Sequence, residues 1–263
     1  MANEHGKPVW YELGTSDLQG AQDFYGKILG WQMFDPGMEG FDYRLAQSDG
    51  DNVAGMMALG AQEGAPPPNW CTYFAVDDCD KSAADIRAAG GNVLKEPAYV
   101  PRTGHFAIVA DPQGAVFGIL QPEAMDENCE TSEGSAFDQQ KAAHGNWHEL
   151  MTTDPEAGFD FYSRLLGWRK SQAMDMGEMG TYQLFSHGGA DIGGMMGLGN
   201  SPVPAWMPYF GVNGIHPAIA RIKDGGGTVH HGPAEVPGGA FIAIAQDPQG
   251  AWFALVGPKE RAA

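Results

Sequence analysis

Residues 9–31 read VWYELGTSDLQGAQDFYGKILGW, and residues 146–168 read NWHELMTTDPEAGFDFYSRLLGW, so the chain contains two similar copies of one stretch. Each version begins with a short run typical of a strand and continues with apolar residues at helical spacing. Each helical segment stops at a glycine, Gly30 or Gly167, which suits the left-handed residue that ends many helices. The repetition predicts two copies of one structural unit.

The match extends over most of the chain, because the offset between corresponding residues stays between 136 and 139. We predict a first domain at residues 1–121 and a second at residues 145–263. Residues 122–144 are polar and acidic without apolar periodicity, and we interpret them as a linker. The further matching segments are 55–57 with 194–196, 69–76 with 205–212, 86–93 with 222–229 and 111–117 with 247–253.

Each copy divides again into two shorter units. A strand, a helix that begins at an N-cap signal such as Ser16-Asp17, and further strands make up the first unit. The second unit has the same order, with the strand TYFAV, the helical segment DKSAADIRAAG and two strands joined by the turn DPQG. The sequence therefore predicts an α+β fold in which four βαβββ modules form two tandem domains.

Composition restricts the classes of function. The net charge is −18, from 33 acidic and 15 basic residues, and this argues against binding to nucleic acid or to anionic membranes. No apolar run reaches the ~18 residues that a membrane span needs, and the first residues do not resemble a secretory signal. The three cysteines form no CxxC pair, which fits a reducing compartment. We expect a cytoplasmic protein, monomer or homodimer, with a small-molecule ligand as its partner.

The chain resembles the vicinal oxygen chelate superfamily, which includes glyoxalase I, bleomycin-resistance proteins and extradiol dioxygenases. The segments DFYGKILGW, DFYSRLLGW and AAGGNV and the two DPQG turns carry this resemblance. Within the superfamily it is most similar to the two-domain group related to the CFP-30B antigen. The resemblance implies that two modules pair to curl a sheet around a cavity, so that each domain is a half-barrel. It implies much less about the reaction, because one fold hosts many reactions.

In metal-dependent members, His or Gln on a module's first strand and Glu on its last strand bind one divalent ion. No expected ligand stands at the matching positions here, and an indole cannot replace an imidazole because its N–H only donates. A register shift of one residue would bring His148 to a ligand position without supplying a carboxylate. We predict no metal and no cofactor, with a divalent metal as the alternative. The matching positions are Trp10, Cys71, Trp147 and Met207 on first strands and Gly55, Gly118, Gly194 and Ala254 on last strands.

The strand pattern identifies two carboxylates as catalytic candidates. Side chains alternate along a strand, so Glu12 lies on the same face as Trp10, and Glu149 on the same face as Trp147. A carboxylate buried beside an indole suits general acid–base work. The structural alternative is a glutamate that is satisfied by hydrogen bonds and fixes its strand.

Other residues are candidates for contact with a ligand, beginning with the indoles of Trp10 and Trp147. Tyr73 and Tyr209 occupy matched strands and carry hydroxyl groups, although a core tyrosine is the simpler interpretation. Met56 and Met195 belong to matched pairs that fit a pocket wall or the core. Cys71 is interpreted as an inert buried thiol, because no histidine is placed to activate it.

Two functions remain open on these residues. The first is a binding protein of the bleomycin-resistance type, with a metal-free aromatic pocket for an apolar or planar molecule in each half. The second is a glyoxalase-like enzyme of the lyase, isomerase or hydroxylase type, in which Glu12 or Glu149 is the general base or a divalent metal takes part. The missing ligands favour the first function.

Overall fold

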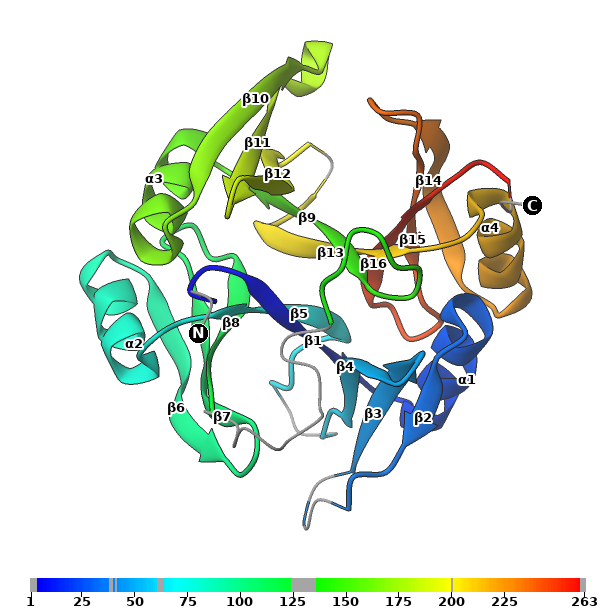
Figure 1. Ribbon diagram of the computed structural model, residues 1–263, viewed down its shortest axis with the longest axis horizontal. Coiled ribbons are helices and arrows are strands. Elements are labelled where there is room, and N and C mark those ends of the chain that lie inside the picture. Colours follow the sequence, from blue (N-terminus) through cyan, green and yellow to red (C-terminus); the bar gives the residue numbers. More distant parts are fainter. Residues whose placement is uncertain are drawn as a thin grey trace. The chain divides into compact units, whose positions relative to one another are not determined.

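The computed structural model contains the order β-α-β-β-β four times along the chain (Figure 1). This confirms the predicted α+β class and the four βαβββ modules. The structure describes residues 4–37, 40, 42–60, 64–123, 136–199 and 201–260. Most of the predicted linker lies outside these ranges, so its conformation stays a prediction.

Modules one and two make up the first half of the chain. Module one consists of β1 (Pro8–Thr15), α1 (Leu18–Leu29), β2 (Gln32–Phe34), β3 (Tyr43–Ser48) and β4 (Asp51–Ala58). Module two consists of β5 (Asn69–Ala75), α2 (Cys79–Ala88), β6 (Asn92–Val100), β7 (Gly104–Ala110) and β8 (Val116–Pro122).

Modules three and four repeat this order in the second half. Module three consists of β9 (Gly145–Thr152), α3 (Pro155–Leu166), β10 (Arg169–Asp175), a 3-10 turn η1 (Gly177–Met179), β11 (Thr181–His187) and β12 (Ala190–Gly197). Module four consists of β13 (Ala205–Gly211), α4 (Ile215–Asp224), β14 (Thr228–Glu235), β15 (Phe241–Gln246) and β16 (Trp252–Gly257).

The strands form two sheets of the same topology. The first has the order β2-β3-β4-β1-β5-β8-β7-β6, and the second has the order β10-β11-β12-β9-β13-β16-β15-β14. In every module the first and last strands are parallel neighbours, and the hairpins between the later strands are antiparallel. The strand that directly follows each helix is always at a sheet edge.

The ends of the two quoted helices are as the sequence predicts. The carboxylates of Asp17 and Asp154 accept hydrogen bonds from backbone N–H groups of the first turn. Gly30 and Gly167 end the helices with φ of 77° and 72°, the left-handed conformation that glycine adopts without strain. Among the described residues, no helix is long and apolar enough to cross a bilayer.

The residue contacts divide the chain into two compact units. The terminal unit contains residues 10–71, 132–147 and 207–263, and the central unit contains residues 1–9, 72–131 and 148–206. Modules one and four therefore supply most of the terminal unit, and modules two and three most of the central unit. Helix α1 packs beside α4 in the former, and α2 beside α3 in the latter (Figure 1).

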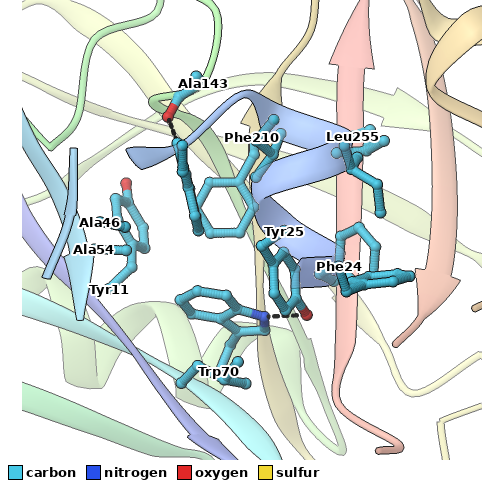
Figure 2. Close-up of a cluster of buried hydrophobic side chains, with 14 of the residues drawn as sticks. Tyr11, Phe24, Tyr25, Ala46, Ala54, Trp70, Ala143, Phe210 and Leu255 are labelled. Atoms are coloured by element: carbon cyan, nitrogen blue, oxygen red, sulfur yellow. Dashed lines mark hydrogen bonds between the residues drawn. The ribbon is translucent and has the colours of Figure 1, made fainter. Parts of the chain in front are cut away.

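An aromatic cluster forms the core of the terminal unit (Figure 2). Tyr25 and Trp70 meet edge to face with ring centroids 5.2 Å apart, and Phe210 lies 5.0 Å from Trp70. Helix α1 contributes Phe24 and Tyr25 to this cluster, and module four contributes Phe210. Burial of such large rings is the main force that holds the two modules together.

A three-residue hydrogen-bond chain crosses each core and explains the repeated motifs. In the terminal unit the Trp70 indole donates to the Tyr25 hydroxyl (2.9 Å; Figure 2), which donates to Asp247 in the second DPQG turn (3.0 Å). In the central unit Trp206, Tyr162 and Asp111 form the same chain at 2.9 and 3.0 Å. The tyrosine of each repeated Phe-Tyr pair (Tyr25 or Tyr162) is therefore hydrogen-bonded to the aspartate of a DPQG turn (Asp247 or Asp111).

Candidate functional site

Strand β1 positions the first pair of predicted site residues. Tyr11 and Leu13 are completely buried, whereas Trp10 and Glu12 are only partly buried, as the period-two alternation of a strand requires. The core side of β1 is therefore the Tyr11–Leu13 face. Trp10 and Glu12 share the opposite face, and Trp10 also packs against the core cluster of the terminal unit.

Tyr43 on β3 joins Trp10 and Glu12 into a hydrogen-bonded set. The Tyr43 hydroxyl donates to Oε2 of Glu12 at 3.1 Å, and Trp10 donates a hydrogen bond to Tyr43. Burial, and then the negative charge of Glu12, raise the pKa of Tyr43 well above its usual range. Tyr43 is therefore a neutral hydroxyl at physiological pH, and it links an indole to a carboxylate.

The negative charge of Glu12 also acts on the thiol of Cys71 on β5. Burial, and then the charge of Glu12, raise the pKa of the Cys71 thiol far above its usual range. A thiol with a raised pKa is a poor nucleophile, because the thiolate is the reactive form. This supports the interpretation of Cys71 as an inert thiol.

Strand β9 repeats the arrangement in the second half. Trp147 is partly buried, and Glu149 is 8% exposed. Gly194 of β12 is the register partner of Glu149, as Gly55 of β4 is the partner of Glu12. The carboxylates thus occupy equivalent places in the two copies.

Tyrosine rings cover the glycines at three of the positions matched to a carboxylate ligand. A Cβ built on Gly55 would lie 1.8 Å from the Tyr43 hydroxyl oxygen. A Cβ on Gly118 would lie 2.1 Å from the Tyr73 ring, and one on Gly194 would lie 2.1 Å from the Tyr182 ring. The rings occupy the space that a side chain at these positions would fill.

This arrangement does not fit the divalent ion of metal-dependent relatives. A glutamate in place of any of these glycines would collide with a tyrosine, and Trp10 and Trp147 supply no lone pair for coordination. Within the described ranges, no three side chains of His, Cys, Asp or Glu are grouped so as to hold a metal ion.

His148, the alternative metal ligand, is part of the core. It is completely buried, and its Nδ1 lies 2.9 Å from the carbonyl oxygen of Ile192. Burial lowers the pKa of His148 to about 4, so the ring is neutral at physiological pH. The strand register places Glu149 opposite Gly194 and His148 opposite Gly193.

The remaining predicted ligand contacts lie in two environments. Tyr73 and Tyr209 are 3% exposed, and their register partners are Gly118 and Ala254, the mapped carboxylate positions. Met56 and Met195 are completely buried.

The two methionines occupy the strand face opposite the carboxylates. Met56 pairs with Leu13 and belongs to the aromatic core cluster. The sulfur of Met195 lies 3.2 Å from a Cβ built on Gly158 in helix α3. These contacts favour a packing role for both.

A separate hollow of about 300 Å³ lies in the terminal unit. Gln140, Asn146, Val212 and Pro258 are among its lining residues, and none of the predicted site residues lines it. Two of its polar side chains are bonded within the protein: Asn146 donates to the carbonyl oxygen of Lys141 at 3.0 Å, and the Lys141 ammonium pairs with Asp51 at 2.7 Å.

Both halves of the chain match one family of known proteins. A profile of the glyoxalase/bleomycin resistance protein/dioxygenase superfamily matches residues 7–119 and again residues 144–255. The chain belongs to this superfamily.

Two relatives of this superfamily member match it over nearly their whole length. The protein CFP32 of Mycobacterium bovis, whose name assigns it provisionally to the glyoxylases, is 32% identical over 96% of this chain and 95% of that protein. The anthracycline biosynthesis protein DnrV of Streptomyces peucetius is 31% identical over 97% of this chain and 94% of that protein. The predicted resemblance to a two-domain glyoxalase-like group is confirmed.

Solved structures share the fold at lower identity. The Mn(II)-bound glyoxalase from Novosphingobium aromaticivorans has a TM-score of 0.66 at 15% identity, over 97% of this chain and 82% of that one. The 2,3-dioxygenase LapB from Pseudomonas sp. KL28 also has a TM-score of 0.66 at 15% identity, over 99% of this chain and 96% of that one. At these identities the likeness concerns the fold.

Sequence reasoning missed Tyr43 and Tyr182, the tyrosines that lie over Gly55 and Gly194. The signal was present, because these tyrosines stand 139 residues apart, the same offset as Gly55 and Gly194. A tyrosine and a glycine repeated together indicate a ring that packs over a missing side chain.

Proposed function

We propose that this protein binds a planar aromatic small molecule at its Trp-x-Glu strands, without the divalent ion used by metal-dependent relatives. The hydrogen-bonded set of Trp10, Tyr43 and Glu12 carries the proposal. It combines a flat apolar surface with one fixed polar group, the combination that orients a small molecule in a binding site. Glu149 and Trp147 offer the same pair of side chains in the second half.

The relatives support the planar class of ligand. DnrV is named for the biosynthesis of anthracyclines, which are planar polycyclic quinones. An indole face stacks favourably on such a ring system, and a carboxylate suits the hydroxyl groups that these molecules carry. The family match supports small-molecule binding as a property of the superfamily.

The proposal is tested by titration with 2-hydroxyanthraquinone, monitored through tryptophan fluorescence. We expect binding that is unchanged by a chelator such as EDTA, and purified protein without stoichiometric metal by elemental mass spectrometry. Trp10→Ala is expected to weaken binding roughly 5- to 150-fold, since stacking on one aromatic side chain is worth ~1–3 kcal/mol. Binding that disappears with EDTA and returns with Mn²⁺ or Fe²⁺ would overturn the metal-free site.

An enzyme remains the second candidate, because Tyr43 fixes the Glu12 carboxylate in one orientation, as a general base requires. The test follows deuterium from D₂O into the product of the methylglyoxal–glutathione hemithioacetal by mass spectrometry. Isomerisation through Glu12 or Glu149 removes the proton of the aldehyde-derived carbon, which becomes the thioester carbonyl, and predicts solvent deuterium at the former ketone carbon. This label should be lost in Glu12→Gln combined with Glu149→Gln. Absence of product with the intact protein would contradict this second function and leave the binding function standing.

A further inference from the structure

We propose that Tyr43 determines the chemical class of ligand that the Glu12 site takes: a neutral molecule that donates a hydroxyl proton, and not an anion. This inference rests on the proposed binding function and deepens it. Tyr43 acts as a positioning residue, since it works through the Glu12 carboxylate.

The direction of the hydrogen bonds supports this assignment. An indole N–H can only donate, so Tyr43 accepts from Trp10 and its own proton points to Oε2 of Glu12, 3.1 Å away. The Tyr43 proton is therefore committed within the protein. A donor directed at a carboxylate stabilises its charged form, and a charged carboxylate only accepts hydrogen bonds.

The position of Tyr43 is fixed by the sheet. Tyr43 pairs with Met57 on β4, two residues beyond Gly55, and its ring crosses the strand to lie over Gly55. Since Gly55 is also the register partner of Glu12, the absent side chain leaves the phenol in reach of the carboxylate. Tyr182 lies over Gly194, the partner of Glu149, in the same way.

A ligand therefore meets an acceptor with a negative charge. A hydroxyl group can donate to Glu12, a methoxy group of similar shape cannot, and a carboxylate is repelled. The formal net charge of −18 has the same sign and adds to the exclusion of anions. The site is consequently selective for hydroxylated rings within the planar class.

Three probes on one scaffold test the inference: 2-hydroxyanthraquinone, 2-methoxyanthraquinone and anthraquinone-2-carboxylate. At pH 6, where the hydroxyl probe is neutral and the carboxylate probe is ionised, we expect the hydroxyl compound to bind at least about tenfold more tightly than either of the others, the size of effect typical of one hydrogen bond to a charged group. Glu12→Gln is expected to weaken the hydroxyl compound and strengthen the carboxylate, so that the preference inverts.

The role of Tyr43 is tested by a pH profile of carboxylate binding. The carboxylate of the anionic probe and that of Glu12 repel each other unless one of them is protonated. The affinity for this probe therefore rises as the pH falls. Tyr43→Phe removes the donor that stabilises the charged carboxylate, and we expect the rise to begin about one pH unit higher than in the intact protein. A merely structural tyrosine would leave this midpoint unchanged.

The matched control is Tyr99→Phe, which removes an exposed tyrosine–glutamate hydrogen bond of 2.8 Å to Glu123. It should alter neither the preference nor the pH profile. If no probe binds the intact protein, the proposed function fails. If all three bind equally, or if the midpoint of Tyr43→Phe coincides with that of the intact protein, the binding function stands and this inference fails.

Discussion

Three glycines of the strands are explained by the tyrosines that lie over them. The ideal Cβ at Gly118 would enter the ring of Tyr73, and the equivalent atom at Gly55 would enter the hydroxyl group of Tyr43. These positions therefore do not use glycine for its backbone freedom. They use it because a ring occupies the place of a side chain.

Gly118→Ala is expected to destabilise the protein by about 1–3 kcal/mol, because the almost completely buried Tyr73 ring must move to accept a methyl group. Gly197→Ala is the matched control, since a Cβ built on that strand glycine has no neighbour within 4 Å. Chemical denaturation of both variants measures the difference. Equal stability of the two variants would contradict the steric explanation.

His148 occupies the place that Tyr11 holds in the first copy, and burial lowers its pKa to about 4 from an ordinary 6.5. Because the folded state disfavours the charged ring, its contribution to stability is present above pH 6.5 and is lost as the pH falls toward 4. At ~1.4 kcal/mol per pH unit, the loss is about 3 kcal/mol over that range. His148→Gln should flatten the dependence of the unfolding free energy on pH between 7 and 5. An unchanged slope in denaturant titrations would show that other groups cause it.

At the scale of the element, the strands after the helices were the ones that the sequence did not locate. These strands, β2, β6, β10 and β14, are the edges of the two sheets and are largely exposed. An exposed edge strand needs no apolar alternation, so its sequence carries little signal. The inner strands and the helices have a buried face and were recognised for that reason.

The two hydrogen-bond chains predict that equivalent substitutions lower the free energy of unfolding by similar amounts in the two units. Tyr25→Phe removes the link between Trp70 and Asp247, and Tyr162→Phe removes the corresponding link to Asp111. Each change is expected to lower the free energy of unfolding by roughly 2–3 kcal/mol, because buried polar partners lose a hydrogen bond. The exposed Tyr99→Phe serves as reference in the same denaturation experiments. A cost below that of the reference would mean that the chains are incidental to stability.

At the scale of the molecule, each compact unit takes modules from both halves of the chain. Tyr25 and Asp247, which share a hydrogen bond, are 222 residues apart in sequence. The predicted domains 1–121 and 145–263 describe the sequence repeat and stay a prediction, whereas the compact units follow a different division.

A fragment of residues 1–121 should therefore not fold as a stable monomer, because it lacks the module-four rings that pack against module one. Co-expressed fragments 1–121 and 145–263 are expected to elute together from a size-exclusion column, with the fluorescence of the intact protein. The single fragment is expected to aggregate or to pair with a second copy of itself. A monomeric fragment 1–121 that unfolds cooperatively would refute this expectation.

The sequence by itself determined the fourfold module, the helix ends at Asp17 and Gly30 and the superfamily, because these depend on local patterns that repeat along the chain. It also placed Glu12 and Trp10 on one strand face, since alternation is a local property. Only the tertiary structure decided that Tyr43 binds Glu12 and that its ring fills the space over Gly55. Those contacts depend on strand register between distant segments, which no local pattern encodes.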